Sequence, residues 1–247
     1  MRGGFLECKV RKSKLQYRKV KTALIIPTYN EAQNIGKLIR ALKLLKINLK
    51  IIVVDDASPD GTGKAVSGNP GVVLIPRRGK LGLGSAYKEG FKYAFKHGYK
   101  VVATMDADFS HDPKFLPKMI SEIKNCDMVI GSRYVCGGSI IGFNLWRKLV
   151  SRSAQFLSMA LLGLKIKDST SGYRVYKSKV LIKIGYAAIL SQGYSYLLES
   201  LYLARKHGFH IYEVPIVFKN RRQGLSKISS SEILKALSTV IRLKIQK

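Results

Sequence analysis

The chain has 247 residues, of which 46% are hydrophobic, and this is enough sequence for one large α/β domain with a substantial core. Its 44 Lys and Arg residues against 15 Asp and Glu residues give a net charge of +29, which favours anionic partners such as nucleic acid, acidic lipid head groups or phosphorylated substrates. No apolar run approaches the roughly 20 residues of a membrane span, and the 3 cysteines lack metal-ligand spacing, so we expect neither a transmembrane segment nor a disulfide framework.

The order of elements along the chain predicts its fold. Residues 1–20 form a basic extension, and an alternation of short apolar runs and amphipathic segments begins at Lys21. The predicted strands are Ala23–Ile26, Ile51–Val54, Val72–Ile75, Val101–Met105 and Met128–Ile130, with helices over 35–45 and 84–97. Strands separated by helices indicate a parallel, doubly wound α/β sheet, in which ligands bind beyond the carboxyl ends of the strands.

The second half of the chain has a different pattern. An amphipathic helix is expected over about 144–162, and Ile211–Phe218 is expected to be one strand, at a sheet edge because of Pro215. A second amphipathic helix closes the chain. We therefore divide the chain into a basic extension (1–20), a catalytic domain (21–228) and a C-terminal amphipathic basic helix (229–247).

The segment Asp106-Ala107-Asp108 ends the fourth predicted strand. Residues two apart on a strand point the same way, so both carboxylates face one side of a crevice, where they would repel each other without a cation. Their oxygens suit Mg²⁺ or Mn²⁺. The alternative is a strand-ending turn in which Asp108 or Ser110 caps a helix opening near Pro113.

Three further polar clusters each allow two interpretations. Asp55-Asp56 ends the second strand and suits either a ribose contact or turn chemistry. Arg77 and its basic neighbours, before Gly82-Leu83-Gly84, suit either a diphosphate or solvent. The third glycine of a dinucleotide fingerprint is absent there, which argues against NAD. The basic loop from Arg221 to Lys227 suits either closure over phosphates or solvation.

Seven motifs in order carry a resemblance that spans about Lys21 to Lys235. They are PTYNE (27–31), VVDDASPDGT (53–62), Arg77 with KLGLGSAYKEG (80–90), MDADFSHDP (105–113), GSRY (131–134), DSTSGYR (168–174) and the loop 221–227. In this order and spacing the chain resembles the dolichol-phosphate mannosyltransferase family, within the family-two glycosyltransferases of the GT-A fold.

The resemblance implies a role for particular residues. The implied nucleoside contacts are Pro27, Tyr29, Glu31, Val54 and Asp56. The implied catalytic residues are Asp106, Asp108 and Arg133, of which the two aspartates hold Mg²⁺ or Mn²⁺ and the diphosphate. Ala107 and Ser110 would lie beside the donor, and Arg133, Arg221 and Lys227 would contact phosphates. Many family members carry Gln where this chain has Ser110, so a metal contact by Ser110 is not implied.

The implied reaction is inverting transfer of a sugar, mannose from GDP-mannose, to dolichyl or polyprenyl phosphate. An ionised phosphate is already a nucleophile, so no strong general base is needed. Asp168 is expected to be a structural partner of Arg174 rather than a base. One alternative keeps the lipid acceptor but uses UDP-glucose, and another uses a UDP-sugar to glycosylate protein or build polysaccharide. An alternative of another class, a basic nucleic-acid-binding module, leaves the acidic pairs unexplained.

A lipid acceptor implies contact with a membrane. We expect the enzyme to be cytoplasmic and peripheral on an anionic surface, bound through its amphipathic helices or through a membrane-anchoring partner subunit. In the helix over about 144–162, Arg147 and Arg152 would meet anionic phosphates, including that of the acceptor. The alternative is that this helix packs on the sheet. The interfacial role is favoured more for the C-terminal helix.

Overall fold

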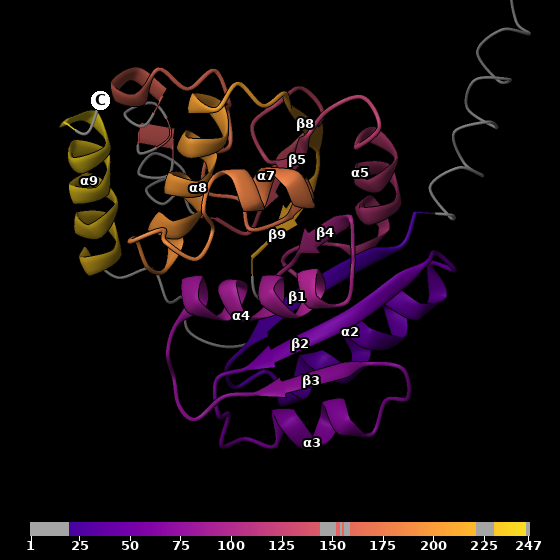
Figure 1. Cartoon of the computed structure of the whole chain (residues 1–247). Coiled ribbons are helices and arrows are strands. Elements are labelled where there is room, and N and C mark those ends of the chain that lie inside the picture. Colours follow the sequence, from indigo (N-terminus) through magenta and orange to yellow (C-terminus); the bar gives the residue numbers. More distant parts are fainter. Residues whose placement is uncertain (1–19, 144–151, 154, 156–158, 221–229, 246–247) are drawn as a thin grey trace, which may run out of the picture.

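The structure, a computed structural model, describes residues 20–143, 152–153, 155, 159–220 and 230–245 (Figure 1). The expected basic extension, apart from Val20, and the loop from Arg221 to Lys227 lie outside these residues, as does Arg147.

A seven-stranded sheet forms the centre of the molecule. Its order is β3 (Val73–Pro76), β2 (Leu49–Asp55), β1 (Thr22–Thr28), β4 (Val101–Thr104), β7 (Arg174–Lys177), β5 (Met128–Ser132) and β8 (Ile211–Pro215). The neighbours β3–β2, β2–β1, β1–β4 and β5–β8 are parallel, whereas β7 is antiparallel to both β4 and β5. The predicted mostly parallel sheet is confirmed, and its antiparallel member is the strand that follows the DSTSGYR motif.

Helices cover both faces of the sheet, because β1 is apolar on both sides. Ala23 and Ile25 of β1 pack in one core cluster, and Leu24 and Ile26 pack in the other. The first cluster includes side chains of α4 (Leu83–Lys96), α7 (Ser178–Lys183), α8 (Tyr194–Lys206) and α9 (Ser230–Ile245). The second includes α2 (Ala32–Leu44), α3 (Thr62–Ser67) and α5 (Leu116–Glu122), which follows the short 3₁₀ helix η2 (Pro113–Phe115). Helices on both faces confirm the doubly wound architecture.

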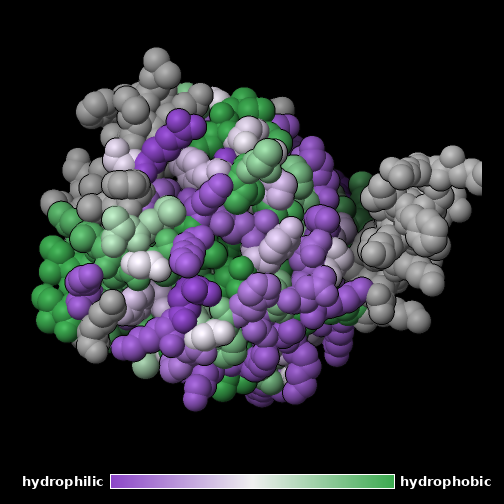
Figure 2. Space-filling view, turned by 90° about the horizontal axis from the view of Figure 1, so that it is seen from above, coloured by the Kyte–Doolittle hydropathy of each residue, from purple (hydrophilic) through white to green (hydrophobic). Residues whose placement is uncertain are grey.

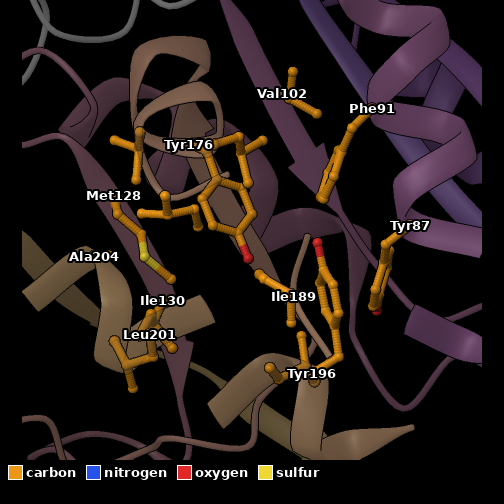
Figure 3. Packing of buried hydrophobic residues seen from close by; sticks show 14 of the residues in the cluster. Tyr87, Phe91, Val102, Met128, Ile130, Tyr176, Ile189, Tyr196, Leu201 and Ala204 are labelled. Carbon is orange, nitrogen blue, oxygen red and sulfur yellow. The ribbon is translucent and has the colours of Figure 1, made fainter. Parts of the chain in front are cut away.

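Aromatic side chains fill the first cluster between α4, α8 and the sheet (Figure 3). Tyr87 of α4 lies between Phe91 and Tyr196, with ring centroids 6.1 and 6.0 Å away. Helix α4 also lies very close to β1, because a Cβ on Gly90 would be 2.5 Å from Cγ2 of Ile25. The middle of α4 is therefore packed tightly against the core.

The predicted strand over Ile211–Phe218 is divided in two, so its prediction as one strand was wrong. β8 lies at the edge of the main sheet, as expected from Pro215. Ile216, directly after β8, donates its N–H to the carbonyl of Ser132 and accepts from the N–H of Ser139 at 3.0 Å each, so it links the end of β5 to the start of the next pairing. The chain then enters β9 (Val217–Lys219), which pairs with β6 (Ser139–Ile141) in a separate two-stranded sheet.

The two amphipathic helices are described to different extents. In the first, residues 152, 153, 155 and 159–162 are helical, and the rest of its expected span up to 158 lies outside the described residues. The second is α9, as predicted. Its Val240 and Leu243 are buried in the core, whereas Leu237, Ile241 and Ile245 are exposed. Among the described helices, none combines the length and the apolar character that crossing a membrane requires.

Candidate active site

Strand order brings four polar segments to one edge of the sheet. β1, β2 and β4 are parallel neighbours, so the residues that follow them meet at the carboxyl edge. β7 runs the opposite way, and its first residue, Arg174, lies opposite Thr104 of β4 and Ile130 of β5. Segment 168–173, which precedes β7, therefore reaches the same edge.

The acidic tip, Asp106 to Asp108, follows β4 at this edge. The side chain of Asp106 is 28% exposed. Asp108 is buried, and its Oδ1 accepts hydrogen bonds from the backbone N–H (3.0 Å) and the hydroxyl (2.6 Å) of Ser110. The backbone N–H of Asp106 donates to Nδ1 of His111 at 3.3 Å. The carboxylate of Asp106 is thus partly exposed to solvent, whereas that of Asp108 is buried and held by hydrogen bonds from Ser110.

The ring of His111 supports this turn in its neutral form. Burial lowers the pKa of His111, and this effect outweighs the nearby carboxylates of Asp106 and Asp108, which raise it. A neutral imidazole has one acceptor nitrogen, which the contact with the N–H of Asp106 requires. The ring also stacks on Tyr173 at 5.0 Å between centroids. The sequence analysis did not single out His111.

The acidic tip has the chemistry of a magnesium or manganese site. Mg²⁺ is commonly held by one or two carboxylates, with waters and substrate phosphates completing the coordination. Asp106 and Asp108 supply that number of carboxylates, and no cluster of three or more His, Cys, Asp or Glu residues suited to a metal occurs in the described part of the chain. The alternative of a helix cap at Asp108 or Ser110 was wrong, because Asp112 caps η2 by accepting from the N–H of Lys114 at 3.0 Å.

A buried ion pair joins the end of β5 to segment 168–173. Nε and Nη2 of Arg133 donate to the two carboxylate oxygens of Asp168 at 2.8 and 2.7 Å, and the backbone N–H of Arg133 adds a third bond at 2.9 Å. Burial would raise the pKa of Asp168, but Arg133 lowers it below its ordinary value. Burial alone would lower the pKa of Arg133, but Asp168 raises it instead. Both groups are therefore charged at neutral pH.

The expected pairing of Asp168 with Arg174 was wrong. Arg174 is fully buried and donates to three backbone carbonyl oxygens, those of Ser169, Ser171 and Leu197, at 2.7–2.8 Å. It thereby ties segment 168–173 to α8. Sequence proximity favoured Arg174, and its charge does help to lower the pKa of Asp168, but its hydrogen bonds go to backbone carbonyls and the ion pair of Asp168 is with Arg133.

Two residues that the sequence analysis did not single out as functional hold the same segment. Gln155 is buried; its Oε1 accepts from the N–H and the hydroxyl of Ser169, and its Nε2 donates to Thr170. Glu213 of β8 accepts from the backbone N–H groups of residues 167 and 168 at 2.9 and 3.0 Å. A sequence signal for the buried contacts of Gln155 is lacking.

The pair Asp55-Asp56 divides into two roles. Asp55 accepts from the hydroxyls of Thr28 and Ser58 at 2.8 and 2.6 Å, so for this residue the turn interpretation is confirmed. Asp56 pairs with Nη1 of Arg77 at 2.6 Å and accepts from the N–H of Gly82 at 2.8 Å. Arg77 thus anchors the start of α4 to the end of β2, and the solvated alternative for this residue was wrong.

The residues predicted to contact the nucleoside lie in or shortly after β1 and β2. Pro27 and Tyr29 are half-buried, and Nζ of Lys80 lies 4.3 Å from the centroid of the Tyr29 ring. Glu31 is buried and accepts from the side-chain amide of Asn34 at 2.9 Å. The side chain of Val54 is fully buried in the core, so a nucleoside would meet this residue through its backbone.

The remaining predicted site residues lie at different depths. Ala107 and Ser110 are buried, at 3% and 2% exposure, and their place beside the donor stays a prediction. Arg152 is exposed. Arg147, Arg221 and Lys227 lie outside the described residues.

Comparisons with known proteins give a consistent result. The profile of glycosyl transferase family 2 matches residues 23–185. Polyprenol monophosphomannose synthase of Mycolicibacterium smegmatis is 41% identical over 227 residues, which cover 89% of this chain and 85% of the relative. Undecaprenyl-phosphate mannosyltransferase of Micrococcus luteus is 38% identical over 222 residues, which cover 88% and 91%.

A solved structure is similar in fold along the whole chain. Glucosyl-3-phosphoglycerate synthase from Mycobacterium tuberculosis, in complex with Mn²⁺, UDP and phosphoglyceric acid, matches with a TM-score of 0.69 and 18% identity. The match covers 99% of this chain and 84% of that one. The likeness shows the fold, which is of the GT-A type that the resemblance implied.

Proposed function

This chain belongs to glycosyl transferase family 2, and from this premise we propose that it transfers mannose from GDP-mannose to a polyprenyl phosphate. The observation that carries the proposal is the acidic tip, which places a partly exposed carboxylate beside a buried one at the ligand-binding edge of the sheet. The mannosyl group and the polyprenyl acceptor follow from the names of the two curated relatives.

The chemistry requires positioning rather than a strong base. An oxygen of the ionised lipid phosphate attacks the anomeric carbon of mannose, the bond from that carbon to the diphosphate breaks, and the nucleoside diphosphate leaves with the electron pair. Asp168 is buried and bonded to Arg133, with a lowered pKa, so it is unsuited to accept a proton. A Mg²⁺ or Mn²⁺ ion on Asp106 and Asp108 would neutralise charge on the departing diphosphate.

The buried ion pair of Arg133 and Asp168 keeps this edge of the sheet rigid. Arg133 and Asp168 join two loops at the same edge, and Thr170 accepts a further bond from Nη2 of Arg133 at 2.8 Å. A rigid edge is what preorganised stabilisation of a leaving group needs. A donor phosphate contact by Arg133 stays a prediction, since its Nε and Nη2 already donate within the protein.

A direct transfer assay tests the activity. We would incubate the protein with labelled GDP-mannose, a short polyprenyl phosphate and Mn²⁺, extract the lipid, and run UDP-glucose in parallel. The expected result is label in the lipid with GDP-mannose and Mn²⁺, and little without the metal. Label in the lipid from UDP-glucose alone would overturn the choice of donor, and no labelled lipid from either donor would overturn the proposed activity.

We also propose that the exposed side of α9 rests on an anionic membrane surface at the cytoplasmic face. Leu237, Ile241 and Ile245 follow one another at intervals of four, so they form one apolar stripe, exposed by 39%, 50% and 77%. Exposed Lys244 lies beside it. Figure 2 shows apolar surface gathered on the left of the molecule, the side on which α9 lies in Figure 1. A basic protein with such a stripe suits anionic lipid.

Flotation with anionic vesicles at low salt tests this surface. The variant carries Ile241→Glu and Ile245→Glu, and the control is Leu44→Glu, which changes a 75%-exposed residue on α2, a helix of the opposite sheet face. The unaltered protein and the control should float, and the variant should stay in the lower fraction. Flotation of the variant, or failure of the unaltered protein to float, would contradict the proposal.

A further inference from the structure

A tyrosine hydroxyl lies unpaired in the core behind the acidic tip. Tyr87 of α4 is fully buried, and its hydroxyl oxygen has no hydrogen-bond partner in the described part of the chain. A buried hydroxyl without a partner is unfavourable, and Phe would fill the same volume without that penalty. Figure 3 shows the ring packed beside Phe91 of the same helix and Tyr196 of α8, which fix its orientation.

The location of the hydroxyl points to Asp106. A Cβ built on Gly172 would be 3.1 Å from the Tyr87 hydroxyl and 3.2 Å from Oδ1 of Asp106, so both oxygens border the same small space over a glycine. Gly172 is held in place, because its carbonyl accepts from the hydroxyl of Thr104 at 2.7 Å. A side chain at position 172 would separate the two oxygens.

The tyrosine remains a hydrogen-bond donor throughout the neutral range. Burial raises the pKa of Tyr87 well above its ordinary value, and the negative charge of Asp106 raises it further. The opposite oxygen of Asp106, Oδ2, lies 3.6 Å from Nδ1 of His111. The carboxylate is therefore flanked by the tyrosine at one oxygen and by the histidine at the other.

We propose that Tyr87 is a positioning residue, whose hydroxyl donates a hydrogen bond to Oδ1 of Asp106 when that carboxylate binds a divalent cation and the donor diphosphate. This inference rests on the proposed function. An outer hydrogen bond of this kind fixes the orientation of a ligating carboxylate, and its loss typically weakens metal binding by about 10–100-fold. The unpaired hydroxyl therefore destabilises the free protein slightly, but it has a hydrogen-bond partner when the metal and the donor are bound.

The test compares Tyr87→Phe with Tyr196→Phe. Tyr196 belongs to the same aromatic cluster, but its hydroxyl donates to the carbonyl of residue 186 at 3.4 Å. The probes are Mn²⁺ with GDP and Mn²⁺ with UDP. The readouts are the Mn²⁺ affinity by titration calorimetry, the spin-resonance spectrum of bound Mn²⁺, and the thermal midpoint of the protein without ligand.

The expected result is weaker metal binding without a loss of stability. Tyr87→Phe should lower Mn²⁺ affinity about tenfold or more and alter the spectrum of the bound ion, without lowering the thermal midpoint of the free protein. Tyr196→Phe should leave Mn²⁺ affinity unchanged. Unchanged affinity in Tyr87→Phe, or an equal loss in both variants, would overturn the inference while leaving the proposed function standing. If the unaltered protein binds neither nucleotide with Mn²⁺, the proposed function itself fails.

Discussion

Replacing Asp168 with Asn should destabilise the protein more than most single substitutions. The carboxylate accepts four hydrogen bonds, three from the backbone and side chain of Arg133 and one from the N–H of Ser171. An asparagine amide keeps one acceptor oxygen but turns its NH₂ group towards donors. It also leaves the Arg133 guanidinium, whose side chain is 10% exposed, without its counter-charge. Breaking a buried ion pair from one side in this way costs about 3–5 kcal/mol.

The loss can be measured as a shift in the thermal midpoint. For a domain of this size 1 kcal/mol corresponds to about 2–4 °C, so Asp168→Asn should lower the midpoint by roughly 6–20 °C. Adding Arg133→Met removes the unpaired charge and should recover about 2 kcal/mol or more. A midpoint within about 2 °C of the unaltered protein would refute the reasoning, as would a double variant less stable than Asp168→Asn.

Three further predictions follow from other parts of the structure. Asp108→Ala should reduce lipid mannosylation at least about 100-fold, whereas Asp112→Ala, which removes the cap of η2, should keep it; an active Asp108→Ala enzyme would contradict the proposed metal site. Gly90→Ala should lower the free energy of unfolding in urea by about 1–3 kcal/mol, because its Cβ would lie 2.5 Å from a side chain of β1. Gly36→Ala in α2, where the nearest side-chain atom would be 3.8 Å away, should raise it by about 0.5–1 kcal/mol. Equal effects of the two substitutions would refute the packing argument. Burial raises the pKa of Glu199, but hydrogen bonds from its ion-pair partner Arg242 of α9 and from Ser191 lower it below its ordinary value. The stabilising contribution of this pair is therefore present above about pH 4.3 and is lost as pH falls through the lower folded pKa. The thermal midpoint should therefore exceed that of Glu199→Gln at neutral pH and converge with it in acid, and parallel curves would count against the ion pair.

The sequence analysis predicted the five strands and two of the helices in the first half of the chain because their signals are local. Continuous apolar runs such as Ile51–Val54 predicted strands buried on both faces, and β2 has both faces covered. Helical spacing from Ile35 to Leu45 indicated α2, whose apolar side is buried against the sheet. The location of the acidic tip followed from the same logic, because a carboxylate pair that ends a buried parallel strand must lie at the carboxyl edge.

The partners of the site residues depended on the tertiary structure. Arg133 and Asp168 are 35 residues apart, and their bidentate contact follows from the insertion of antiparallel β7 between β4 and β5. A periodicity in one stretch of chain contains no information on that order. The contacts of Gln155 could not be predicted for the same reason, since folding brings the segment that it supports to it.

The sequence by itself determined the order along the chain of the first five strands, the two-sided burial of the sheet, and the position of the acidic tip at its carboxyl edge. These properties depend on residue types at short spacing along the chain, because the geometry of a strand or a helix is local. Only the tertiary structure decided that Asp168 pairs with Arg133, that Arg174 ties the loop to α8, and that the Tyr87 hydroxyl lies beside Gly172 and Asp106. Those contacts depend on which strands become neighbours, and that choice is made by packing of the whole chain.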